Sequence, residues 1–191
     1  MGLKVLSVAS EAAPLIKTGG LADVAGALPG ALAAHGVEVT SLVPGYPAVL
    51  AKLGKSKAVH TWDALLGTRA RLLAAKLGEQ PLLVLDAPAL FAREGSPYAD
   101  AGGKDWDDNW RRFAAFARAA ADIAGGAVKG RAFDLVHVHD WQAGLVPAYM
   151  RLAPQKGARA VPSVITIHNM AFQGYYPAEI FPELGLPASA W

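Results

Sequence analysis

Short, nearly continuous apolar runs alternate along the chain with longer segments whose apolar residues recur at helical spacing. The runs that predict single strands are residues 3–9, 37–43, 135–139 and 164–168. Two further runs, 69–77 and 82–85, are joined by a short turn and predict a local antiparallel pair. Because most of these strands lack polar alternation, we expect a parallel sheet that is buried on both faces.

The segments with helical spacing are residues 21–35, 107–124 and 141–152. Pro29 lies inside the first of them and predicts a kink or a division of that helix. Gly36 is a stop signal after the first, and Gly125-Gly126 is a stop signal after the second. Residues 88–104, rich in Gly, Pro and polar side chains, predict a long loop. The pattern therefore predicts one α/β domain over residues 1–191, a three-layer Rossmann-like sheet with a small hairpin insertion near residues 60–85.

Composition narrows the class of protein. Hydrophobic residues make up 53% of the 191 residues and charged residues 18%, which excludes a disordered chain and allows a real core. The net charge of +2 comes from scattered basic residues and gives no support to nucleic-acid binding. The chain has no cysteine, so disulfides and thiolate metal sites are excluded. No apolar run suits a membrane span or a signal peptide, so we expect a cytoplasmic protein.

A lysine and two glycines stand between the first predicted strand and the first predicted helix, in Lys17-Thr18-Gly19-Gly20-Leu21. Glycine lets the backbone approach a ligand closely, and the free N–H groups of a helix's first turn bind anions. Lysine adds a positive charge that can offset phosphate. The spacing fits neither G-x-G-x-x-G nor the P-loop pattern. The stretch predicts either a loop for a phosphorylated ligand or a plain turn with a solvated lysine.

Polar clusters follow three of the predicted strands, at residues 11–20, 139–141 and 168–169. In an open α/β sheet, ligands bind beyond the carboxyl ends of the strands. Because all three clusters stand at such ends, we expect them to converge on one binding site.

Histidines in these clusters have more than one interpretation. His137 and His139 alternate on a strand and point to the same side, so they can ligate zinc with His168 or Asp140, or be buried and bonded to neighbouring backbone. Asp140 stands where a helix N-cap belongs and can line the crevice as well. His168 is a candidate general acid or base, a donor to a ligand hydroxyl, or a core histidine.

Four stretches resemble bacterial glycogen synthases and plant starch synthases: residues 10–24, 95–98, 137–143 and 166–174. They occur in the right order at compatible spacing, and the resemblance covers essentially the whole chain. It implies the N-terminal half of a GT-B glycosyltransferase, a retaining enzyme that moves glucose from ADP-glucose to the non-reducing end of an α-1,4-glucan. It also implies that neither a metal nor a cofactor is needed.

The resemblance implies roles for individual residues. His168 is implied to be catalytic and to contact the transferred glucose, and Asp140 to be a carboxylate needed for activity. The residues implied to bind substrate are Lys17, Gly19 and Gly20 at the sugar nucleotide, Tyr98 and Asn169 near the donor sugar, and Glu11 at the acceptor glucan. Family members are more than twice as long and bind the nucleotide between two domains. We therefore expect the C-terminal nucleotide-binding domain to be absent from this chain, and the chain alone to be inactive.

Two other functions stay open at this point. One is a metal-dependent hydrolase that uses His137, His139 and His168, for which bound zinc would be diagnostic. The other is a non-catalytic glucan-binding module, which would bind maltooligosaccharide but not ADP-glucose.

Overall fold

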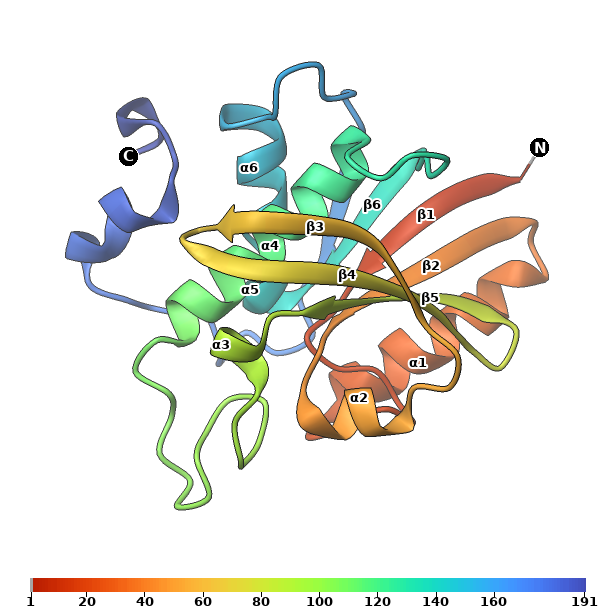
Figure 1. The fold of residues 1–191 in the computed structure, drawn as a ribbon, viewed down its shortest axis with the longest axis horizontal. Helices are drawn as coiled ribbons and strands as arrows, with labels where there is room; N and C mark the ends of the chain where they lie inside the picture. Colours follow the sequence, from red (N-terminus) through yellow and green to blue (C-terminus); the bar gives the residue numbers. More distant parts are fainter. Residues whose placement is uncertain (1) are drawn as a thin grey trace.

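A single seven-stranded sheet organises the computed structural model, which describes residues 2–191 (Figure 1). Its strands are β1 (Leu3–Val8), β2 (Val37–Pro44), β3 (Lys57–Leu65), β4 (Thr68–Leu77), β5 (Gln80–Asp86), β6 (Leu135–His139) and β7 (Ser163–Thr166). Their order across the sheet is β3-β4-β5-β2-β1-β6-β7. Neighbours from β5 to β7 are parallel, whereas β4 is antiparallel to both β3 and β5. The predicted parallel sheet and the predicted antiparallel pair are both confirmed.

Helices cover both faces of this sheet. They are α1 (Gly20–Ala33), α2 (Pro47–Lys52), α3 (Pro88–Phe91), α4 (Asn109–Gly125), α5 (Asp140–Ala143) and α6 (Val146–Leu152), followed by the 3-10 turns η1 (Ala178–Leu184) and η2 (Ala188–Ala190). The crossovers β1-α1-β2 and β6-α6-β7 run in opposite directions from the centre of the sheet. Because such crossovers share one hand, α1 lies on one face and α6, packed with α4, on the other (Figure 1). Within residues 2–191, no helix is long and apolar enough to cross a membrane.

Two predicted helices differ in detail from the structure. The first is continuous through Pro29, so the predicted division is wrong. Pro29 lies on the buried face of α1 together with Leu21 and Ala25, and α1 packs against β2. The segment predicted as one helix over residues 141–152 is instead α5 and α6. Gly144 ends α5, and Pro147 stands in the first turn of α6, where proline is favoured.

The predicted hairpin near residues 60–85 is present, and its strands extend the main sheet. The pattern did not reveal β3, because most of its side chains are exposed or half-buried and give no continuous apolar run. Its turn to β4 is Leu66-Gly67, both with positive φ, as a two-residue type I′ turn requires. Leucine is an unusual residue there, so the turn carried no sequence signal.

The strand order reverses between β1 and β6. The chain leaves β1 toward β2 on one side, and β6 and β7 fill the other side. The carboxyl ends of these strands therefore flank a topological switch point, where ligands of open α/β sheets bind.

Candidate functional site

A cavity of about 640 Å³ opens at this switch point. It is lined by residues that follow β1, β6 and β7 and by residues from the loop before α4. All of the predicted site residues except Lys17 contribute to its wall, namely Glu11, Gly19, Gly20, Tyr98, Asp140, His168 and Asn169. The expected convergence of the three polar clusters is therefore what the fold produces.

Glu11 is the centre of a hydrogen-bond network after β1. Its side chain is 2% exposed, and its carboxylate accepts hydrogen bonds from the Thr18 hydroxyl at 2.7 Å and from the Thr18 backbone N–H. The Tyr98 hydroxyl donates to Glu11 Oε1 at 2.5 Å and lies 2.8 Å from Ser10 Oγ. Burial raises the pKa of Tyr98 above its ordinary value, so this hydroxyl keeps its proton and donates. The network holds the loop over residues 11–18 against the loop that carries Tyr98.

The N-terminus of α1 forms a second part of the cavity wall. Gly19 is the N-cap and makes no side-chain cap bond, so the N–H groups of the first turn have no partner within the helix. A Cβ placed on Gly19 or on Gly20 would meet no atom within 4 Å. The space in front of both glycines is open, which suits the close approach of an anion to the backbone.

Lys17 is the one predicted residue that the fold does not bring into the cavity wall. Its ammonium group pairs with Asp23 Oδ1 at 2.7 Å, and the two side chains are 54% and 56% exposed. Because an exposed pair of this kind is worth about 1 kcal/mol or less, the lysine is held only weakly in this position.

Asp140 links the ends of β6 and β7. It has a φ of 55°, a left-handed conformation that few residues other than glycine and asparagine adopt readily. Its Oδ1 accepts a hydrogen bond from the backbone N–H of His168 at 2.6 Å. The N-cap interpretation is wrong, because α5 begins at Asp140 itself and the carboxylate bonds to the neighbouring loop. Asp140 thereby fixes the backbone that presents His168 to the cavity.

The three histidines lie together, and His168 is the one that lines the cavity. His137 and His139 are on the same side of β6, as predicted, with ring centroids 4.1 Å apart. His137 Nε2 bonds to the Thr166 hydroxyl at 2.7 Å, rather than to backbone. His139 is fully buried, and its Nδ1 lies 2.9 Å from His168 Nε2. Burial, followed by the neighbouring histidines, lowers the pKa of His139 to about 3, so the ring is neutral near neutral pH.

This arrangement does not suit the metal-ligand set considered from the sequence. The ring nitrogens of His139 and His168 bond to each other, and His137 is turned to Thr166. In the part of the chain that the structure describes, no group of three or more histidine or carboxylate side chains is placed to hold a metal ion. The ligand geometry that the hydrolase alternative needs is therefore lacking among residues 2–191.

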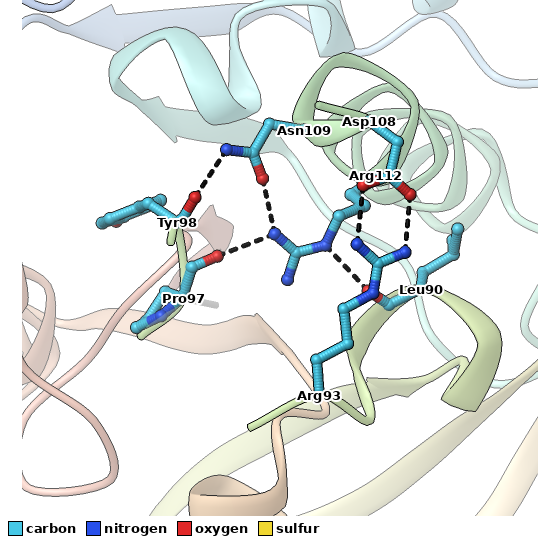
Figure 2. A network of polar contacts seen from close by, with 7 residues as sticks. All are labelled: Leu90, Arg93, Pro97, Tyr98, Asp108, Asn109 and Arg112. Carbon is cyan, nitrogen blue, oxygen red and sulfur yellow. Dashed lines mark hydrogen bonds and ion pairs between the residues drawn. The ribbon is translucent and has the colours of Figure 1, made fainter. Parts of the chain in front are cut away.

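A second network, which the sequence analysis missed, positions Tyr98 (Figure 2). The guanidinium of Arg112 on α4 is 1% exposed and donates to the carbonyl oxygens of Leu90 and Pro97 and to Asn109 Oδ1, at 2.7, 2.9 and 2.5 Å. Asn109 Nδ2 in turn donates to the Tyr98 carbonyl at 2.8 Å. Burial lowers the pKa of Arg112. An arginine on an alanine-rich helix gives no sign of such a role, because two of its three acceptors are backbone carbonyls that lie 22 and 15 residues away in the chain.

Three more side chains complete this region. Arg93 and Asp108 form a paired ion bridge with both distances at 2.6 Å, which closes the base of the loop that carries Tyr98 (Figure 2). Gln142, also missed, lines the cavity and has a buried Oε1 without a hydrogen-bond partner within residues 2–191. Such an oxygen is available to accept a hydrogen bond from a ligand hydroxyl.

Comparisons with known proteins agree with this architecture. The family model described as starch synthase catalytic domain matches residues 4–191. The glycogen synthase of Novosphingobium aromaticivorans is 68% identical over 191 residues, covering 100% of this chain and 39% of that protein. Glycogen synthase 1 of Rhizobium meliloti is 57% identical over 190 residues, covering 99% of this chain and 39% of that protein. The chain thus spans about 39% of the length of these curated relatives.

A solved structure is similar over nearly the whole chain. It is the catalytic domain of starch synthase IV from Arabidopsis thaliana bound to ADP and acarbose. The two share 30% sequence identity with a TM-score of 0.78, and the match covers 97% of this chain and 37% of that one.

Proposed function

Because the chain belongs to the starch synthase catalytic domain family, we propose that it forms one wall of the catalytic cleft of a cytoplasmic glucosyltransferase in glycogen biosynthesis. The whole enzyme transfers glucose from ADP-glucose to the non-reducing end of an α-1,4-glucan and retains the anomeric configuration. The opposite wall, with the rest of the nucleotide site, belongs to a C-terminal domain outside these residues. The share of the relatives that this chain spans, about 39%, supports that division.

One observation carries this proposal. The cavity at the switch point gathers side chains from four separate segments, and they include nearly every residue that the family resemblance implies. Side chains that merely complete a core would be distributed over the sheet, whereas these face one open space. The relative solved with ADP and acarbose supports a nucleotide and a glucan as ligands of such a cleft.

The diphosphate of the donor is proposed to lie against the N-terminus of α1. The free N–H groups of its first turn and the open backbone at Gly19 and Gly20 can bind the phosphate oxygens. These donors stabilise the charge that develops as the diphosphate leaves. Lys17 joins them by exchanging its contact with Asp23 for a phosphate, at small cost because the pair is exposed.

The glucose ring is proposed to lie between His168, Asn169 and Gln142. Asp140 holds the His168 backbone, so the imidazole is oriented before the sugar arrives. The 4-hydroxyl of the acceptor attacks C1 on the face from which the diphosphate departs. The C1–oxygen bond to the diphosphate breaks, the new glycosidic bond forms, and the hydroxyl proton passes to a departing phosphate oxygen. Glu11, which also lines the cavity, is proposed to lie on the acceptor side of the glucose.

Transfer of labelled glucose from ADP-glucose to glycogen tests the proposal. We expect the full-length protein to extend the glucan, to release ADP in equal amount and to form only α-1,4 links. The 191-residue chain alone is expected to give no significant transfer, since half of the donor site is missing. Absence of transfer by the full-length protein, or hydrolysis of ADP-glucose without glucan extension, would contradict it. Dialysis against EDTA, expected to leave the rate unchanged, tests the metal-dependent alternative separately.

A further inference from the structure

Three side chains form a hydrogen-bonded row from the interior of the sheet to the cavity. Ser7 lies on β1 and is 3% exposed, and its Oγ is 3.2 Å from His139 Nε2. His139 ends β6 and is fully buried, and its Nδ1 is 2.9 Å from Nε2 of His168. His168 lines the cavity. Both ring nitrogens of His139 are therefore used inside the protein, and one ring nitrogen of His168 is as well.

The direction of these bonds follows from the donors available. A neutral imidazole has one N–H and one bare nitrogen, and His139 is neutral because burial lowers its pKa to about 3. Within residues 2–191, Ser7 Oγ makes no hydrogen bond other than the one to His139. A buried hydroxyl hydrogen without an acceptor is costly, so the Ser7 hydroxyl donates to His139 Nε2. His139 then carries its hydrogen on Nδ1 and donates it to His168 Nε2.

His137 does not interfere with this arrangement. It lies beside His139, but its Nε2 bonds to Thr166 Oγ1 at 2.7 Å, and its own pKa is lowered by burial and by His168. Asp140 follows His139 in the chain, and its Oδ1 is engaged by the His168 backbone N–H. The row from Ser7 to His168 is thus a separate unit.

We infer that His139, directed by Ser7, is a positioning residue that holds His168 as its Nδ1–H tautomer. His168 Nε2 is occupied as an acceptor, so the group that His168 offers a ligand is the Nδ1–H donor. A histidine in this state donates a hydrogen bond to a ligand oxygen and has no free nitrogen with which to accept a proton. This assignment decides between the two chemical roles considered for His168, general base and hydroxyl-recognising donor. That the oxygen belongs to a glucose rests on the proposed function.

Nitrogen-15 NMR of the chain, labelled at histidine, tests the tautomer directly. We expect His168 and His139 each to show a protonated Nδ1 and a bare Nε2 near neutral pH. A His168 spectrum dominated by protonated Nε2 would overturn the inference. This measurement needs no ligand, no activity and no variant, so it holds or fails independently of the proposed function.

A matched pair of variants tests the role of His139. The amide of His139→Asn reaches the place of Nδ1 and keeps a donor for His168, whereas His139→Leu removes the donor and keeps an apolar side chain of similar size. We expect the His168 tautomer to be retained in the first and to shift toward Nε2–H in the second. Thr166→Val, which frees only His137, is expected to leave it unchanged. The same tautomer in the two His139 variants would overturn the inference; if His139→Leu does not fold, the wild-type spectrum decides.

The activity of the full-length protein is a second test of the positioning role of His139. We expect His139→Leu to lower the rate of glucose transfer about tenfold and His139→Asn to retain most of it, because a partner that orients a functional histidine typically contributes on that order. Equal rates in the two variants would contradict the positioning role. A wild-type protein without transferase activity would instead refute the proposed function and leave the tautomer result standing.

Discussion

The carboxylate of Asp140 accepts a hydrogen bond at 2.6 Å from the backbone N–H of His168, and so ties together the loops that follow β6 and β7. Asp140 does this from a left-handed backbone conformation, with φ at 55°. The residue therefore has two requirements to meet at once: it must tolerate positive φ, and it must offer an oxygen to the next loop.

These two requirements can be separated by substitution. Asp140→Asn keeps an oxygen and tolerates the conformation, so we expect it to change the free energy of unfolding by less than about 1 kcal/mol. Asp140→Gly loses the oxygen alone, and Asp140→Ala loses the oxygen and adds backbone strain, for a cost of about 2–3 kcal/mol in the alanine variant. Urea unfolding of the three variants gives the order of their free energies of unfolding. An Asp140→Ala variant as stable as Asp140→Asn would show that neither requirement exists.

Stability should depend on pH through His139. Its pKa is about 3 in the folded protein and about 6.5 when unfolded, so the unfolded chain binds the proton first. The contribution of neutral His139 to the free energy of unfolding is fully present above about pH 6.5 and is lost as the pH falls toward the folded-state pKa. Between about pH 7 and pH 5 we expect a loss of about 2 kcal/mol from this residue, with a further loss from His137, whose pKa is also lowered.

Urea unfolding at a series of pH values, compared between variants, measures this effect. His139→Asn is expected to flatten the dependence in this range, where carboxylates contribute little. His35→Gln is the matched control, since His35 is exposed at the end of α1. If the free energy of unfolding changed with pH in the same way in wild type and in His139→Asn, a lowered pKa of His139 would be contradicted.

Arg112 is expected to be a large contributor to the stability of the loop that carries Tyr98. Replacement by methionine leaves three acceptors without a donor, at Leu90, Pro97 and Asn109. We expect a loss of about 3 kcal/mol in the free energy of unfolding. Arg111→Met is the control on the same helix, because within residues 2–191 the Arg111 side chain makes a single hydrogen bond, to the Leu66 carbonyl at 3.2 Å. Equal losses in the two variants would argue against the network in Figure 2.

Gly174 should resist substitution because it lies against Trp141. Its φ is 65°, and an added Cβ would come within 2.4 Å of the Trp141 indole. Gly157 has a φ of 78° but open space around it, so Gly157→Ala measures the backbone strain alone, about 1 kcal/mol. We expect Gly174→Ala to cost about 1–3 kcal/mol more, from overpacking. Thermal unfolding of the two variants compares them, and similar midpoints would exclude a tight contact with Trp141.

The sequence allowed the centre of the fold to be predicted and left its edges uncertain. Strands such as β1 and β6 are buried on both faces, so their apolar runs reveal them. The strand β3 lies in an edge hairpin with mostly exposed side chains, and propensity alone could not distinguish it from a loop. Gly144 and Pro147 carried a local signal that a helix would be interrupted, and the apolar pattern on either side of them concealed it.

The candidate site was predictable where a functional side chain directly follows the end of a strand. Asp140 and His168 stand one and two residues beyond β6 and β7, so topology alone brings them to the same edge. The contributions of Arg112 and Ser7 depend on contacts between segments that are far apart in the chain. Only the packed structure shows those contacts, because no spacing rule connects such residues in the sequence.

The central claim is that the cavity beside Asp140 and His168 carries the glucose transfer. The most direct measurement is the rate of transfer from labelled ADP-glucose to glycogen by the full-length protein with His168→Ala or Asp140→Ala, compared with His35→Ala. We predict that the two cavity variants, once shown to be folded, lose at least about a hundredfold in rate, whereas His35→Ala keeps the wild-type rate. Folded cavity variants that transfer glucose as fast as the wild type would contradict the account.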